Sequence, residues 1–231
     1  FNESEDFLTY PKSRVKDVQL ALEAGADVVV FPETEEVYPG GIPERLESVD
    51  YGALTHLWEA EHRPGHFDGV VAVVRSLFEH TQPTRAFFGE KDWQQLAVIR
   101  RLAADEFPGL QVVPVETERE PGGLAKSSRN TRLSDEGRCH AESLHWALRS
   151  VADAKGDPEV MADVLRSLSD RGFDVEYFAV VDADRRREGL LRRWRCERHG
   201  GVWRWHGRRQ HDRWRDTSPT GHAACDVRKA F

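Results

Sequence analysis

Two short runs of polar and charged residues hold the groups in this sequence that are best suited to binding phosphate. The first, Gly89–Asp92, follows the apolar segment Ala86–Phe88 and precedes a stretch with helical periodicity. The second, Lys126–Asn130, places an ammonium, two hydroxyls and a guanidinium next to one another. A lysine offers a point charge to phosphate, and an arginine offers a planar fork that binds two oxygens. Together the two runs predict a nucleotide-dependent enzyme.

The first run is predicted to lie at the end of a strand in a parallel α/β sheet. A helix is expected over about 94–106 and a second strand over Val112–Val115. Upstream, Asp68 is the expected cap of a helix with an apolar stripe over 70–78, and Asp27–Pro32 is interpreted as a buried strand. Alternating strands and helices are typical of parallel sheets, which bind ligands where their strands end.

After Gly123 the pattern predicts a smaller α+β region. One long helix is expected to start at Ser134 and a second at Asp157, where Pro158 suits the first helical position. The alternation in Val175–Val181 then predicts a half-buried strand.

Composition excludes several classes of protein. With 231 residues, 39% hydrophobic and 32% charged, the chain is expected to be soluble and to bury roughly 70% of its unfolded surface. No apolar run approaches the ~20 residues of a membrane span, and no signal peptide is visible, although the sequence begins at Phe1. Three widely spaced cysteines predict a reducing cytoplasm and no disulfide scaffold.

Four motifs, in order and spacing, resemble the pantoate–β-alanine ligase family. They are His62–Phe67, Gly89–Gln95, Arg119–Leu124 and Ser127–Asn130. Tyr10-Pro11 and the pattern Pro32-x5-Tyr38-Pro39 also match, so that the resemblance covers roughly residues 1 to 184.

The resemblance implies an α/β fold. A Rossmann-like nucleotidyltransferase parallel sheet is expected over 1–117 and a small α+β C-terminal domain over 118–184, in a homodimer. The implied reaction uses ATP and Mg2+ to adenylate pantoate, after which β-alanine displaces AMP to give pantothenate, the step of vitamin B5 and coenzyme A biosynthesis. No membrane or nucleic-acid partner is implied.

The resemblance also assigns the site, residue by residue. The ATP site would consist of Gly89, Glu90, Lys91, Asp92, Lys126, Ser127, Ser128 and Arg129. Catalytic roles are expected for Lys91, Ser127, Ser128 and Arg129, and Asp92 would hold either ribose or Mg2+. Pantoate would be bound by Gln95 and by an apolar wall of Val73, Val74 and Phe88.

Simpler interpretations exist for each motif alone. Glu90–Asp92 could be a solvated turn, Ser127-Ser128 a pair of helix-capping hydroxyls, and Gln94-Gln95 a helix start. We expect no protein metal site, because Pro64-Gly65 prevents His62 and His66 from sharing one helix face.

The sequence departs from the family pattern in three places. The family's Pro-Thr-Met-Gly-x-Leu-His-x-Gly-His segment is not found, so we expect a chain that lacks the first strand and the His-motif helix and has impaired activity. Lys126 replaces an apolar residue and would either contact phosphate or point to water. Glu118 replaces a small apolar residue near the adenine.

The third departure is the tail, 185–231, which is rich in Trp and Arg. It holds 14 basic and 5 acidic residues, whereas the whole chain has a net charge of −7. We interpret it as a frameshifted, disordered extension. The rival is a nucleic-acid binder that uses phosphate contacts and stacking. For the chain as a whole, the enzymatic alternative to the ligase is another nucleotidyltransferase relative with a different acceptor.

Overall fold

The computed structural model describes residues 13–41, 46–181, 195–199 and 202–206. They fall into two compact units. The first holds the described residues up to Phe88 together with Gln94–Val115, and the second holds Gly89–Trp93 together with the described residues from Glu116 onward. The predicted Tyr10-Pro11 motif and most of the tail lie outside the described residues.

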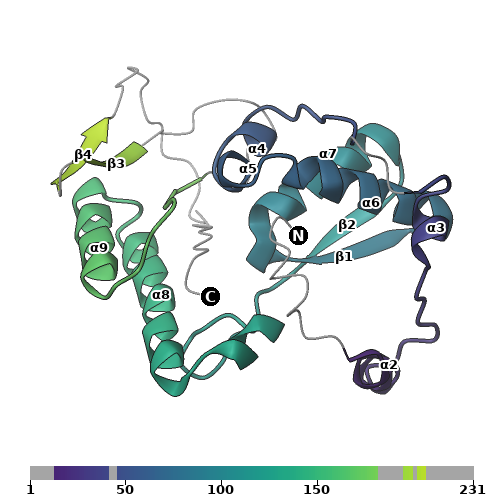
Figure 1. The fold of residues 1–231 in the computed structure, drawn as a ribbon, viewed down its shortest axis with the longest axis horizontal. Coiled ribbons are helices and arrows are strands. Elements are labelled where there is room, and N and C mark those ends of the chain that lie inside the picture. The colour runs from purple at the N-terminus through teal and green to yellow at the C-terminus, as the bar shows by residue number, and fades with distance from the viewer. Residues whose placement is uncertain (1–12, 42–45, 182–194, 200–201, 207–231) are drawn as a thin grey trace. The chain divides into compact units, whose positions relative to one another are not determined.

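The first unit contains a two-stranded sheet of β1 (Arg85–Gly89) and β2 (Gln111–Val115), which α7 (Trp93–Glu106) connects (Figure 1). The amide of Gln111, at the start of β2, donates to the carbonyl oxygen of Thr84, just before β1, at 3.0 Å. Because the two strands begin at the same edge of the sheet, they run parallel. The predicted α/β character, the helix and both strands are therefore confirmed.

Helices α6 (His66–Thr81) and α7 provide most of the core of this unit. Its buried side chains are Phe67, Val71, Val74, Phe78, Val98, Ile99 and Leu102, and Ala86, Phe88 and Val112 of the strands pack against them. The Phe78 ring meets Phe88 and Phe107 edge-on, with centroids 6.3 and 5.4 Å apart. Each buried aliphatic or aromatic side chain contributes about 1.5–3 kcal/mol, so this core holds the two strands against α6 and α7.

Two predictions for the part of the first unit that precedes β1 are wrong. Asp27–Pro32 forms no strand, and Val28 and Val30 are 75% and 67% exposed. A strand needs a neighbour for its backbone groups, and no segment in the described ranges pairs with this one. Asp68 is not a cap either: α6 begins at His66 after Gly65 (φ 76°), and the Asp68 carboxylate accepts from the Val49 amide at 2.9 Å.

The remaining helices of the first unit are short or exposed. They are α2 (Arg14–Glu23), which buries none of its residues, α3 (Thr34–Val37), α4 (Ala53–His56) and α5 (Glu59–His62). In the described part of the chain, no helix is long and apolar enough to cross a membrane.

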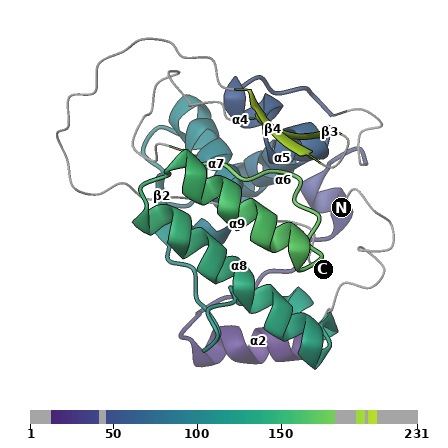
Figure 2. The ribbon, with the colours of Figure 1, turned by 90° about the vertical axis from the view of Figure 1, so that its left-hand side faces the viewer.

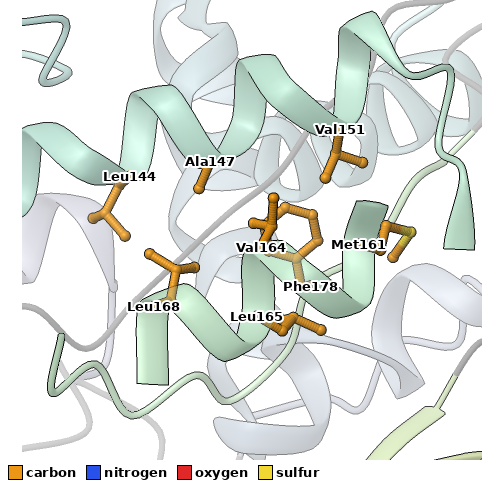
Figure 3. Packing of buried hydrophobic residues seen from close by; sticks show 8 residues of the cluster. All are labelled: Leu144, Ala147, Val151, Met161, Val164, Leu165, Leu168 and Phe178. Atoms are coloured by element: carbon orange, nitrogen blue, oxygen red, sulfur yellow. The ribbon is translucent and has the colours of Figure 1, made fainter. Parts of the chain in front are cut away.

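The second unit contains a helical pair, α8 (Asp135–Asp153) and α9 (Pro158–Asp170), side by side in both views (Figures 1 and 2). Both predicted starts are confirmed. The Ser134 hydroxyl accepts from the Gly137 amide at 3.0 Å, and the Asp157 carboxylate accepts from Glu159 and Val160 amides. Figure 3 shows the side chains between them, Leu144, Ala147, Val151, Met161, Val164, Leu165, Leu168 and Phe178.

The predicted strand over Val175–Val181 is absent from the described elements, although the segment is half-buried. Phe178 is 9% exposed, and Val175 and Val180 pack against the helical pair. The apolar alternation thus predicts burial correctly but not backbone pairing. In the tail, β3 (Arg195–His199) pairs antiparallel with β4 (Val202–His206), with His199 opposite Val202. The sequence pattern did not predict this hairpin.

Candidate functional site

The Gly89–Asp92 run forms a strand–turn–helix junction. Gly89 ends β1, the 3-10 turn η1 (Glu90–Asp92) follows, and α7 begins at Trp93 (Figure 1). The side chains of Glu90 and Lys91 are exposed, and Asp92 is half-buried. The predicted location at a strand end is confirmed. A turn that leads into a helix N-terminus presents backbone N–H groups, which favour a bound anion.

The second run forms another 3-10 turn, η2 (Ser128–Arg132), capped by Ser127. The Ser127 hydroxyl oxygen accepts from the Arg129 amide at 3.3 Å, as the capping interpretation expected. Capping does not prevent phosphate binding, because a hydroxyl that accepts a hydrogen bond still has its own hydrogen to donate. Ser128 is exposed and Arg129 half-buried.

These two turns belong to the same compact unit. Gly89–Trp93 groups with the residues that follow Glu116, which include Lys126–Arg129. Lys91 and Arg129 thus belong to one compact unit, although they are far apart in sequence. The chemistry of the two turns, an ammonium, a guanidinium and hydroxyls, suits an anion with several oxygens.

Comparisons with known proteins identify the family. The family model for pantoate–β-alanine ligase matches residues 1–199. The pantothenate synthetase of Rubrobacter xylanophilus is 43% identical over 196 residues, which cover 80% of this chain and 67% of that protein. The chain belongs to the pantoate–β-alanine ligase family. It is an enzyme of pantothenate synthesis, and it spans about two thirds of the length of its curated relatives.

Solved structures agree with this assignment. The enzyme from Thermus thermophilus superposes with a TM-score of 0.72 at 43% identity, over 80% of this chain and 68% of that one. The ligase from Francisella tularensis, whose crystals hold β-γ ATP and β-alanine, gives a TM-score of 0.68 at 29% identity, over 79% and 67%.

The residues predicted to bind pantoate lie in the first unit of this ligase. The Gln95 side chain is half-buried and makes no hydrogen bond to a described residue. Val74 is 9% exposed and belongs to the core, against which Val73 and Phe88 also pack. The contact of these four residues with pantoate stays a prediction. The structure shows in addition that Val74 packs in the hydrophobic core.

Gln94, the neighbour of Gln95, has a structural role that the sequence analysis missed. It is 5% exposed; its Oε1 accepts from the Glu59 amide at 3.2 Å, and its Nε2 donates to the carbonyls of Leu54 and Leu57, both at 2.9 Å. It therefore fastens the 54–59 segment to α7. The available signal was its spacing, because Gln94 falls on the buried face that also carries Val98.

The His62–Phe67 motif is a turn between two helices, as predicted from Pro64-Gly65. Helix α5 ends at His62 and α6 begins at His66, so the two histidines lie on different helices. The Arg63 guanidinium reaches back to the carboxylate of Glu59, which is 2% exposed, at 2.9 Å. This ion pair gives the motif a structural function.

Lys126 and Glu118, the two residues that depart from the family pattern, form an ion pair. The Lys126 ammonium lies 2.8 Å from the Glu118 carboxylate, and the Lys126 amide donates to the Glu118 carbonyl at 2.8 Å. The hydrogen bond from Lys126 lowers the pKa of Glu118, and the same bond raises the pKa of Lys126. The two residues that differ from the family pattern therefore pair with each other.

Proposed function

We propose that this chain joins pantoate to β-alanine through a pantoyl-adenylate formed from ATP. Membership of the ligase family supports the overall reaction, and the Francisella tularensis relative in complex with β-γ ATP and β-alanine supports both substrates. The structural observation that carries the proposal concerns two turns. Gly89–Asp92 and Ser127–Arg129 both offer groups suited to phosphate, and both belong to one compact unit.

The proposed first step brings two anions together. A pantoate carboxylate oxygen bonds to the α-phosphorus as the bond to the bridging oxygen breaks and pyrophosphate leaves. In the second step the amine of β-alanine attacks the acyl carbon, loses a proton and displaces AMP. The protein must offset repulsion between the reactants and hold them in line.

Lys91 and Arg129 are the proposed cations for the phosphates. Lys91 is exposed at the end of β1, and Arg129 lies in η2, where the Ser127 cap fixes its amide. Ser127 and Ser128 would donate hydroxyl hydrogen bonds as charge develops on the departing oxygens. Loss of one such preorganised donor costs about 10²–10³ in rate.

Mg2+ is the proposed metal, and the carboxylates at η1 fit it. Mg2+ in nucleotide sites is held mainly by phosphates and waters, with one or two carboxylates from the protein. Asp92 or Glu90 would supply these. When bound, the ion would neutralise charge on the phosphate oxygens.

Gln95 is the proposed ligand of pantoate. Its amide has both a donor and an acceptor, which suit the hydroxyl and carboxylate groups of that substrate. The neighbouring apolar residues Val73 and Phe88 are proposed to contact its methyl groups. We also propose a Rossmann-like nucleotidyltransferase sheet, a homodimer and a cytoplasmic location, which light scattering and cell fractionation would test.

The test is product analysis with the whole chain. Incubation with ATP, Mg2+, pantoate and β-alanine is expected to yield pantothenate, AMP and pyrophosphate in equal amounts, measured by mass spectrometry. Hydroxylamine in place of β-alanine should give pantoyl hydroxamate, because it traps an acyl-adenylate. Formation of ADP, or pantothenate without AMP, would refute the proposed chemistry.

A further inference from the structure

A partly buried hydrogen-bond network lies next to the Ser127–Arg129 turn in sequence and includes Asn130, the residue that follows Arg129. One carboxylate oxygen of Glu120 accepts from Asn130 Nδ2 at 3.0 Å, and the other accepts from the guanidinium of Arg138. Asn130 Nδ2 also donates to the Ala125 carbonyl at 3.0 Å, and Arg138 Nη2 donates to the Asn130 carbonyl at 3.2 Å. Asn130 is 3% exposed, so the network is anchored inside the protein.

The network joins three separate pieces of backbone. Glu120 belongs to a short hairpin in which Arg119 pairs antiparallel with Ala125. Asn130 is in η2, adjacent to Arg129, and Arg138 is in the first turns of α8. Glu120 is the acceptor common to both side-chain donors, so its carboxylate fixes η2 relative to the hairpin and α8.

The hairpin is also pressed onto α8 at its turn. A Cβ added at Gly122 would overlap the Glu142 carboxyl, and one added at Gly123 would lie 2.8 Å from His145 Cγ, nearer than Cβ atoms come to other atoms. The hairpin therefore rests against α8 at two places, the glycine turn and the Glu120–Arg138 pair. A rigid support of this kind suits residues that must be held accurately.

We propose that Glu120, Asn130 and Arg138 are positioning residues that hold Ser128 and Arg129 in place for the phosphates of ATP. This rests on the proposed function, since it assumes that η2 binds ATP. Glu120 contributes an acceptor that serves two donors at once. Asn130 is itself part of η2, so the hydrogen bond from its side chain to Glu120 fixes the backbone of that turn. Arg138 connects Glu120 and Asn130 to α8.

The informative variant is Glu120→Gln. The new side chain keeps one oxygen for Asn130 but turns an NH2 group toward the Arg138 guanidinium, where two donors meet without an acceptor. ATP affinity of the whole chain, measured by titration calorimetry, is expected to fall about tenfold. Without this hydrogen bond to a charged group, η2 would occupy its binding conformation only part of the time, and the apparent affinity falls by that fraction. Pantoate affinity should not change. Arg149→Ala is the matched control, because Arg149 is also on α8 and pairs with exposed Asp153 at 3.7 Å.

A double variant that exchanges the charges of Glu120 and Arg138 distinguishes a positioning role from a contribution to stability alone. Glu120→Arg with Arg138→Glu can restore the ion pair and the melting temperature, but it leaves the Asn130 NH2 facing a donor. We expect ATP affinity to stay low in this double variant. Recovery of ATP affinity along with stability would overturn the assignment of Glu120 as the acceptor that positions η2.

The outcomes also distinguish this proposal from the one it rests on. Wild-type protein that fails to bind ATP overturns the proposed function and this proposal with it. Wild-type protein that binds ATP, with Glu120→Gln binding equally well, overturns the positioning role alone. A parallel loss of ATP and pantoate affinity in Glu120→Gln would show general damage and would also overturn it.

Discussion

Gly123→Ala is expected to destabilise the second unit for two reasons that can be measured apart. Gly123 has φ +88°, a conformation that costs a non-glycine residue about 1–3 kcal/mol. Its added methyl would also meet the His145 imidazole at 2.8 Å from Cγ, and overpacking of this kind costs a further ~1–3 kcal/mol.

Gly172→Ala isolates the first term within the same unit. Gly172 has φ +86°, but an added Cβ there meets no atom within 4 Å, so only the backbone strain remains. Urea unfolding followed by circular dichroism should therefore show a larger loss of stability for Gly123→Ala than for Gly172→Ala. Removal of the imidazole in Gly123→Ala/His145→Ala should recover part of the difference. Equal losses at the two glycines would refute the close contact between the hairpin turn and α8.

Two further predictions concern single side chains. Gln94→Ala should cost about 2 kcal/mol of stability, because the buried amide of Glu59 and the partly buried carbonyls of Leu54 and Leu57 lose their partner. Gln95→Ala should instead lower pantoate affinity with little change in the urea midpoint. Burial, followed by the charges on Arg119 and Arg149, lowers the pKa of His145 in the folded protein below the usual 6.5. Because a proton on His145 then favours the unfolded chain, the contribution of His145 to stability is present above pH 6.5 and is lost as the pH falls through the folded pKa. His145→Gln should flatten the stability profile in that range, and an unchanged profile would contradict this assignment.

Local patterns predicted the elements around the first turn well. The segment 94–106 has a clear helical period, and the strands that flank it are short apolar runs, so periodicity alone sufficed for α7, β1 and β2. It failed for Asp27–Pro32 and Val175–Val181, because a strand depends on a distant pairing partner that no local pattern encodes.

The candidate site shows the same division. Lys91 and Arg129 were found from their motifs, because runs of charged and hydroxyl residues can be recognised locally. The contact between Glu120 and Arg138 was missed, although Glu120 lies in the Arg119–Leu124 motif, since the two residues are 18 apart and each alone resembles an ordinary surface charge. The Lys126–Glu118 pair was missed for the same reason: each residue was considered as a substitution in its own right, whereas the ion pair requires the hairpin that brings them together.

The central claim is that Lys91 and Arg129 bind the phosphates of one ATP molecule. Titration calorimetry of ATP and AMP against the wild type, Lys91→Ala and Arg129→Ala tests it most directly, with Arg132→Ala, in the same 3-10 turn, as control. Each of the first two variants is predicted to weaken ATP binding by about 10- to 100-fold and AMP binding much less, because each loses a charge-assisted hydrogen bond. Unchanged ATP affinity in both variants would contradict the account.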